Sequence, residues 1–247
     1  MQKELQEFLI FKSDFYEHPD FIYSDPIQIP KKFSIKEDIE IAAFLIATIA
    51  WGNRQSIIKS GEKLMRIMGN SPYDFIMNYN PGKEYDFVHR TFNSKDLAYF
   101  FSALKHCYQN GGLEKQFLSS DKNLKNRIIA FRTIFLSLNS EARTIKHVSN
   151  PEAGSAAKRL VMFLRWMVRS NAKGVDFGLW KSVSPSELYI PLDVHTGNIA
   201  RKLGILQRNQ NDWKTNEELR NVFLKLDPLD PARFDFALFG LGAFEKF

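Results

Sequence analysis

Asp193 lies at a position where a carboxylate could take part in chemistry. It follows Pro191 and begins the stretch DVHTGNIARKLG, in which Arg201 and Lys202 precede Gly204. This pattern predicts a helix with an acidic N-cap, basic residues in its last turn and a glycine just beyond its end. An N-cap carboxylate stays ionised and keeps a fixed direction, and a carboxylate that stabilises a reacting cation needs both properties. Capping alone also explains an aspartate at this position.

Lys158 is a candidate nucleophile. It lies in the first turn of a helix predicted over 155–171, directly after the turn-forming stretch NPEAGS at 150–155. The helix dipole and the neighbouring Arg159 both disfavour a protonated amine at this place. A lysine attacks an electrophilic carbon only after it has lost its proton, so these surroundings favour covalent chemistry.

Both side chains lie in a segment that is rich in basic residues. Residues 154–208 carry nine basic and three acidic side chains, an excess of six that equals the net charge of +6 for the whole chain. On the predicted helix, Arg165 and Arg169 each fall within about 20° of Lys158, opposite an apolar stripe. Such a row could follow the phosphate backbone of a nucleic acid, but a solvated helix face commonly carries lysine and arginine as well.

The elements that must position these residues are predicted to be helices. No run of alternating polar and apolar residues indicates a strand, and no repeat is present. The segment 171–192 is predicted to be a long irregular connection, and DPLDP at 227–231 predicts Asp230 as an N-cap with Pro231 in the first turn. The predicted helices span 2–16, 37–51, 54–69, 72–78, 94–109, 112–118, 123–138, 155–171, 194–203, 215–225 and 231–242.

The composition limits the kind of chemistry that the chain can perform. One cysteine, Cys107, excludes an internal disulfide and any four-cysteine zinc or iron–sulfur site. No histidine pair has metal-ligand spacing and no glycine-rich loop suits a phosphate, so neither a metal nor another cofactor is expected. The longest apolar run, 39–51, is shorter than the roughly 20 residues of a membrane helix, and no export signal is evident. We expect a monomer in the cytoplasm, associated with the nucleoid if bacterial, without membrane contact.

Three stretches resemble the helix-hairpin-helix DNA glycosylases. IPLDVHTGNIARKLGIL (190–206) is similar to the segment that supplies their catalytic aspartate, and DPARFDFALFGLGAF (230–244) resembles the helix that follows it. Residues 38–69 resemble an early helix pair that ends in a loop probing the duplex. Most of 38–244 looks closest to an uncharacterised bacterial family related to the archaeal 8-oxoguanine DNA glycosylases. The usual hairpin, L-P-G-V-G-x-K-[TS]-A, is absent, and NPEAGSAAKR keeps only Pro151, Gly154 and Lys158 of it, at longer spacing.

The resemblance implies an all-α fold of two helical lobes with a cleft between them. Lobe A covers about 38–150 and lobe B about 151–247, with residues 1–37 packing near lobe B. It also implies excision of a damaged base, such as an oxidised purine, from duplex DNA. Lys158 would attack the sugar C1′ of a flipped nucleotide, and the resulting Schiff base would allow β-elimination, while Asp193 stabilises the sugar cation. The alternative is a nucleic-acid-binding module on the same scaffold that has lost catalysis.

The resemblance and the charge pattern together nominate further site residues. Flipped bases stack on aromatic or apolar surfaces, so a base pocket of aromatic side chains is expected, although core packing also explains tryptophan and phenylalanine in a chain with 22 Phe. The candidates for the base pocket are Trp51, Trp166, Phe177 and Trp180, and the candidate DNA contacts are Arg54, Gln55, Arg159, Arg165, Arg169, His195 and Arg201.

Overall fold

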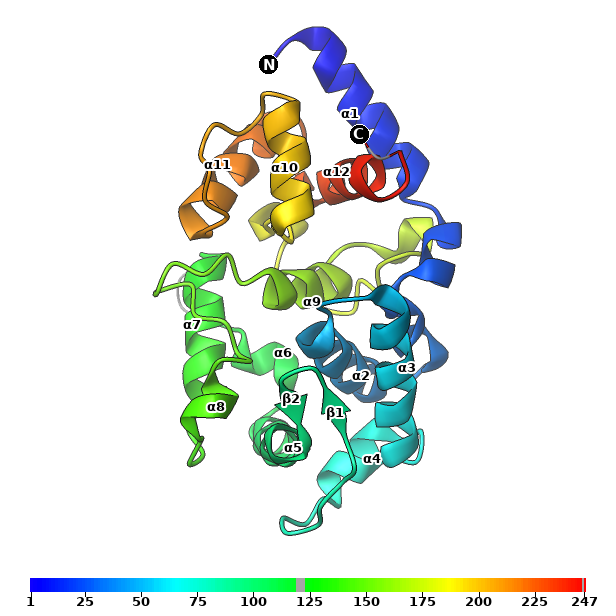
Figure 1. Ribbon diagram of the computed structural model, residues 1–247, viewed down its shortest axis with the longest axis vertical. Coiled ribbons are helices and arrows are strands. Elements are labelled where there is room, and N and C mark those ends of the chain that lie inside the picture. The colour runs from blue at the N-terminus through cyan, green and yellow to red at the C-terminus, as the bar shows by residue number, and fades with distance from the viewer. Residues whose placement is uncertain (119–122, 246) are drawn as a thin grey trace. The chain divides into compact units, whose positions relative to one another are not determined.

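The computed structural model describes residues 1–118, 123–245 and 247, and Figure 1 shows the course of the chain. Their regular secondary structure is helical except for one short two-stranded hairpin, so the predicted all-α class is confirmed. They divide into two compact units. Unit 1 contains Met1–Ile22, 123–125 and Asn150–Phe247, and unit 2 contains 23–118 and 126–149. No helix in the described part of the chain is both long and apolar enough to cross a membrane.

Unit 2 is built around α2 (Lys36–Ile49), which is buried from Asp38 to Ile49. A helix that is apolar on nearly every side needs cover on every side, and α3 (Arg54–Ile67) and α4 (Pro72–Met77) both pack against it. The other elements of unit 2 are β1 (Val88–His89), β2 (Phe92–Asn93), α5 (Ser94–Gln109), α6 (Leu113–Gln116), most of α7 (Leu124–Phe135), α8 (Ala142–Ile145) and 3-10 turns at Pro26–Gln28 and Pro30–Lys32.

The hairpin of β1 and β2 is a feature that the sequence did not predict. The strands are antiparallel, with Val88 opposite Asn93 and His89 opposite Phe92. Two residues per strand are too few for an alternating pattern to be seen. Asn93 also caps α5: its side chain accepts hydrogen bonds from the backbone of Lys95 and Asp96, so the hairpin leads directly into that helix.

Unit 1 contains α1 (Lys3–Tyr16), α9 (Lys158–Val168), α10 (Val194–Lys202), α11 (Trp213–Leu224) and α12 (Phe234–Ala243). In Figure 1, α10, α11 and α12 are neighbours, and α12 packs against both α1 and α10. One apolar core joins them, because each of these four helices turns an apolar face inward; it includes Leu9, Ile199, Leu219 and Leu238.

The connection at 171–192 is irregular, as expected, apart from two 3-10 turns, Asn171–Lys173 and Pro185–Glu187, and it buries Asp176 and Trp180. Two expectations for unit 1 need correction. Helix α9 begins at Lys158 rather than at 155. Asp230 does precede a turn that begins at Pro231, but its side chain makes no capping hydrogen bond. Its carboxylate instead accepts hydrogen bonds from Arg169.

Candidate functional site

The loop 150–157 is fixed by its own backbone and by α11. Gly154, with a φ of 88°, donates its N–H to the carbonyl of Pro151 at 3.0 Å, and Ser155 donates to Asn150 at 3.1 Å. The Gly154 carbonyl accepts from the N–H of Trp213 at 2.9 Å, at the first residue of α11. The left-handed backbone at Gly154 costs little because glycine has no Cβ. The loop therefore delivers the chain to the start of α9 in one defined direction.

Ala157 makes the final turn into α9. Its φ of 49° and ψ of 36° place it in the left-handed region, and its side chain is buried. An L-residue in this conformation stores roughly 1–2 kcal/mol of strain. Its carbonyl accepts the N–H of Val161 at 2.9 Å, so the helix begins at the next residue, Lys158. Backbone strain directly beside Lys158 is the kind of feature that clusters at functional sites.

Asp193 divides its two carboxylate oxygens between two tasks. Oδ1 accepts the backbone N–H of Thr196 at 2.9 Å, which is the N-cap predicted for α10. Oδ2 lies 3.8 Å from Nζ of Lys158, and the two side chains are 35% and 30% exposed. The side chain of Asn211 donates to the Asp193 carbonyl at 3.2 Å and holds the backbone of this position. Capping and contact with the amine are therefore compatible in one side chain.

The contact between Lys158 and Asp193 brings two helix N-termini to the same place. Lys158 is the first residue of α9, which has 11 residues, and Asp193 is the N-cap of α10, which has 9. Each N-terminus has unpaired N–H groups and a partial positive charge. Two such ends, with an amine between them and solvent access to it, form a site suited to an anionic group.

A buried carboxyl group, Asp235 in the first turn of α12, lies behind this pair and was not predicted from the sequence. Burial raises the pKa of Asp235 to about 6, since the attraction of Arg165 and Lys158 does not outweigh burial and the nearby charge of Asp193. The Asp235 carboxylate is paired with Arg165. Because Asp193 and Lys158 both act on the pKa of Asp235, the three groups share one electrostatic environment. In the sequence, Asp235 is one aspartate among many, and no local pattern marks it as part of a site.

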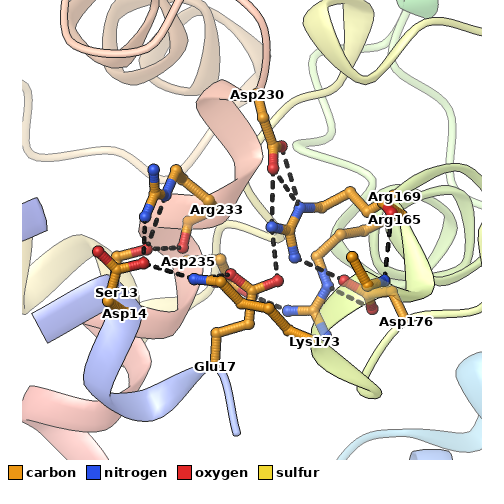
Figure 2. A network of polar contacts seen from close by, with 12 residues as sticks. Ser13, Asp14, Glu17, Arg165, Arg169, Lys173, Asp176, Asp230, Arg233 and Asp235 are labelled. Carbon is orange, nitrogen blue, oxygen red and sulfur yellow. Dashed lines mark hydrogen bonds and ion pairs between the residues drawn. The ribbon is translucent and has the colours of Figure 1, made fainter.

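Figure 2 shows the network of polar contacts in which Arg165 and Arg169 take part. Arg165 contacts Asp176 and Asp235, and Arg169 contacts Glu17, Asp176 and Asp230. Burial alone would lower the pKa of Arg169, but the carboxylates around it outweigh that effect and hold the pKa above its ordinary value.

The prediction that Arg165 and Arg169 lie on an exposed face of α9 and contact DNA is therefore wrong in its premise. The two side chains are only 4% and 3% exposed, and their charges are neutralised by carboxylates. Most of those carboxylates come from outside the basic segment 154–208, namely Glu17, Asp230 and Asp235. The excess of basic residues in that segment therefore does not give an equally large positive charge on the surface.

The other nominated residues of unit 1 have different surroundings. His195 is exposed on the first turn of α10, and Arg159 is half-buried, with its pKa lowered to about 10 by burial. Arg201 is occupied in holding the loop after α10: it donates to the carbonyl of Arg208 at 2.7 Å and to the Asn211 side chain at 2.6 Å. Trp166 and Trp180 are 0% and 1% exposed and belong to the core, whereas Phe177 is half-buried.

Three nominated residues belong to unit 2, at the turn between α2 and α3. Trp51 is half-buried and stacks on His147, with ring centroids 5.9 Å apart. The side chain of Asn53 caps α3 by accepting the N–H of Ser56 at 3.1 Å. Arg54 and Gln55 are the first two residues of that helix. Within the described residues, no three His, Cys, Asp or Glu side chains are grouped as metal ligands would be.

Comparison with known proteins gives one match. A family model described as "Protein of unknown function (DUF2400)" matches residues 25–244. The chain belongs to the DUF2400 family. The match covers α2 to α12, and thus both Lys158 and Asp193, whereas α1 precedes it. No curated protein and no solved structure matches the chain.

Proposed function

We propose that this DUF2400 protein is a DNA glycosylase with an associated lyase activity, in which Lys158 is the nucleophile and Asp193 its carboxylate partner. The observation that carries the proposal is the distance of 3.8 Å between Lys158 Nζ and Asp193 Oδ2, in a place that solvent reaches. The resemblance of 190–206 to the segment of helix-hairpin-helix glycosylases that supplies an aspartate agrees with it. Each residue is also held by its own backbone: Lys158 by the loop 150–157, and Asp193 by its cap.

The chemistry requires a neutral amine. Asp193 can accept the proton that Lys158 must lose and pass it to water, which returns Asp193 to its ionised form before the sugar reacts. The nitrogen lone pair then forms a bond to C1′ of the target nucleotide while the bond from C1′ to the base breaks. The electron pair of that bond leaves with the base, which takes up a proton. The attached nitrogen loses its second proton and the C1′–O4′ bond opens, with O4′ protonated, to give an iminium ion. Removal of a proton from C2′ expels the 3′ phosphate and completes β-elimination.

Asp193 contributes an ionised oxygen at the point where positive charge develops on the sugar. Its direction is fixed before substrate binds, because Oδ1 is already committed to the backbone of Thr196. A charge that is oriented in advance stabilises a transition state without reorganisation, and the loss of one such group typically costs on the order of 10²–10³ in rate. The ion pair contributes little to stability, about 1 kcal/mol at most, because both partners are partly exposed.

Borohydride trapping tests the nucleophile. Duplexes with an oxidised purine or an abasic site are incubated with the protein and borohydride, and covalent adducts are separated by denaturing electrophoresis. We expect an adduct with the wild-type protein and none with Lys158→Gln, which keeps the length of the side chain but has no nucleophilic amine. Lys214→Gln is the matched control, since Lys214 is an exposed lysine of the same unit on the first turn of α11. An adduct that survives in Lys158→Gln would contradict the assignment.

Asp193→Asn separates catalysis from capping. Asparagine is as good an N-cap as aspartate, so the melting temperature should change little. The rate of base release should fall by about 10²–10³ because the charge is lost. A variant that unfolds, or one that releases every base as fast as the wild type, would leave Asp193 as a structural cap only. Binding of DNA without an adduct on any lesion would favour the module that has lost catalysis.

A further inference from the structure

Helix α3 of unit 2 is rich in basic side chains. Its 14 residues contain Arg54, Lys59, Lys63 and Arg66 and a single acid, Glu62. Lys59 and Arg66 are exposed, and neither has a carboxylate oxygen within 4.0 Å in the part of the chain that the structure describes. Lys63 contacts Asp86 at 2.8 Å, but Asp86 is 96% exposed and Lys63 41%, so salt and competing anions readily weaken the pair.

The three long cations lie on one face of the helix. Lys59, Lys63 and Arg66 are at positions i, i+4 and i+7, which fall within about 60° of one another and span roughly 10 Å along the axis. The opposite face, with Ile57, Gly61, Leu64 and Met65, is buried in unit 2. The helix is therefore anchored on one side and presents a straight cationic row on the other.

The β1–β2 hairpin adds a fourth cation at the N-terminal end of α3. His89 is within hydrogen-bonding distance of Ser60 on α3, at 2.9 Å, and this fixes the hairpin against the helix. The next residue, Arg90, is exposed, has a φ of 56°, and has no acidic partner among the described residues. Its guanidinium lies over Gly52, where an added Cβ would be 2.6 Å from Nη1. A side chain larger than hydrogen at 52 would thus displace Arg90.

We propose that this face, the α3 ridge (Lys59, Lys63, Arg66 and Arg90), binds the phosphate backbone of duplex DNA. The choice of DNA rests on the proposed function, whereas the choice of a polyanion rests on the ridge itself. A straight row of cations matches a row of phosphates. Among the described residues of α3 no large apolar side chain is exposed, since Ile58 and Ile67 are half-buried, and the hairpin that carries Arg90 adds one isolated exposed apolar residue, Val88. The ridge therefore lacks both the apolar centre of a protein–protein interface and an anchor for a membrane surface.

Salt-dependent binding to an undamaged duplex tests the ridge. The variant Lys59→Gln/Lys63→Gln/Arg66→Gln is compared with Lys3→Gln/Lys214→Gln/Lys225→Gln, which removes three exposed lysines of unit 1 and changes the net charge equally. Binding of a labelled duplex is followed by fluorescence anisotropy from 50 to 200 mM salt. Each lost phosphate contact lowers the slope of log K against log salt by about 0.9. Over this fourfold range the wild type should therefore lose about 40-fold more affinity than the ridge variant.

The expected results are a slope lower by roughly 3 in the ridge variant, a slope lower by about 1 in Arg90→Gln, and an unchanged slope in the control. Thermal melting of each variant shows that the fold is kept. Equal slopes for the ridge variant and the control would overturn the proposal, and tighter ridge-dependent binding of poly-glutamate than of the duplex would overturn the choice of DNA. Borohydride trapping separates failure of the ridge proposal from failure of the proposed function. An adduct at Lys158 with no effect of the ridge variant overturns only the ridge, whereas a ridge effect without any adduct overturns only the glycosylase and lyase activity.

Discussion

Replacement of Arg169 tests whether the polar network of Figure 2 is a structural element of unit 1. Arg169 donates to Asp176 at 2.6 Å and to Asp230 at 2.7 Å, and its Nη2 lies 2.7 Å from Glu17. Arg169→Met keeps most of the volume and removes the charge. It leaves two buried carboxylates, Asp176 at 1% and Glu17 at 6% exposure, without their shortest cationic contact. Each keeps one longer ion pair, to Arg165 at 3.4 Å and to Lys173 at 3.3 Å.

The loss of one partner from a buried ion pair costs about 3–5 kcal/mol, because an uncompensated charge remains. The two residual ion pairs place the expected loss at the lower end, about 3 kcal/mol. For a chain of this length, each kcal/mol lowers the melting temperature by about 2–4 °C, so a fall of roughly 6–12 °C is expected. The double variant Arg169→Met/Asp176→Asn should recover part of the loss, since an amide in place of the carboxylate carries no charge.

Urea denaturation and thermal melting measure the effect. Arg208→Met is the matched control, because Arg208 and its partner Asp212 are 38% and 31% exposed and lie 2.6 Å apart. Such a pair contributes less than about 1 kcal/mol. If Arg169→Met is no less stable than Arg208→Met, the network is not a structural element. A charge reversal, Arg169→Glu, that stays folded at the wild-type melting temperature and binds DNA more weakly would restore Arg169 as a surface contact.

Two further predictions concern the surroundings of Lys158. Ala157→Gly should have an unfolding free energy within about 1 kcal/mol of the wild type, because relief of the left-handed strain offsets the entropy cost of glycine. Ala157→Val should lose at least about 2 kcal/mol of unfolding free energy. Equal stabilities of the two variants in urea titrations would contradict the strain at Ala157. The pKa of Asp235 rises from 3.8 to about 6 on folding, so its stabilising contribution is fully present below pH 3.8 and is lost as the pH rises through 6. Relative to the wild type, Asp235→Asn should gain about 2.4 kcal/mol in unfolding free energy between pH 4 and pH 7, and a difference that does not change with pH would refute the shift.

Local interactions explain what the sequence alone determined. The pattern around 193–204 was sufficient to predict α10, its N-cap and its basic last turn, because capping and the helix dipole act within one or two turns. The all-α class follows in the same way from apolar spacing, and Lys158 is indeed at a helix start. The short elements β1, β2 and α8, of two to four residues, were missed because each covers only about one period of its pattern, so no repeat can be seen.

Contacts between distant segments decided the rest. Periodicity predicted that Arg165 and Arg169 lie opposite the apolar stripe of the helix, but it does not contain the information that Glu17, just after α1, and Asp230, before α12, supply carboxylates there. The same ambiguity made Asp230 look like a cap, whereas a guanidinium 61 residues earlier in the chain takes its oxygens. The distance of 3.8 Å between Lys158 and Asp193 is likewise tertiary, since 35 residues of chain separate the two helix starts. Whether a charged side chain faces water or a counter-charge depends on which element covers it, and that is a property of the folded chain rather than of the local sequence.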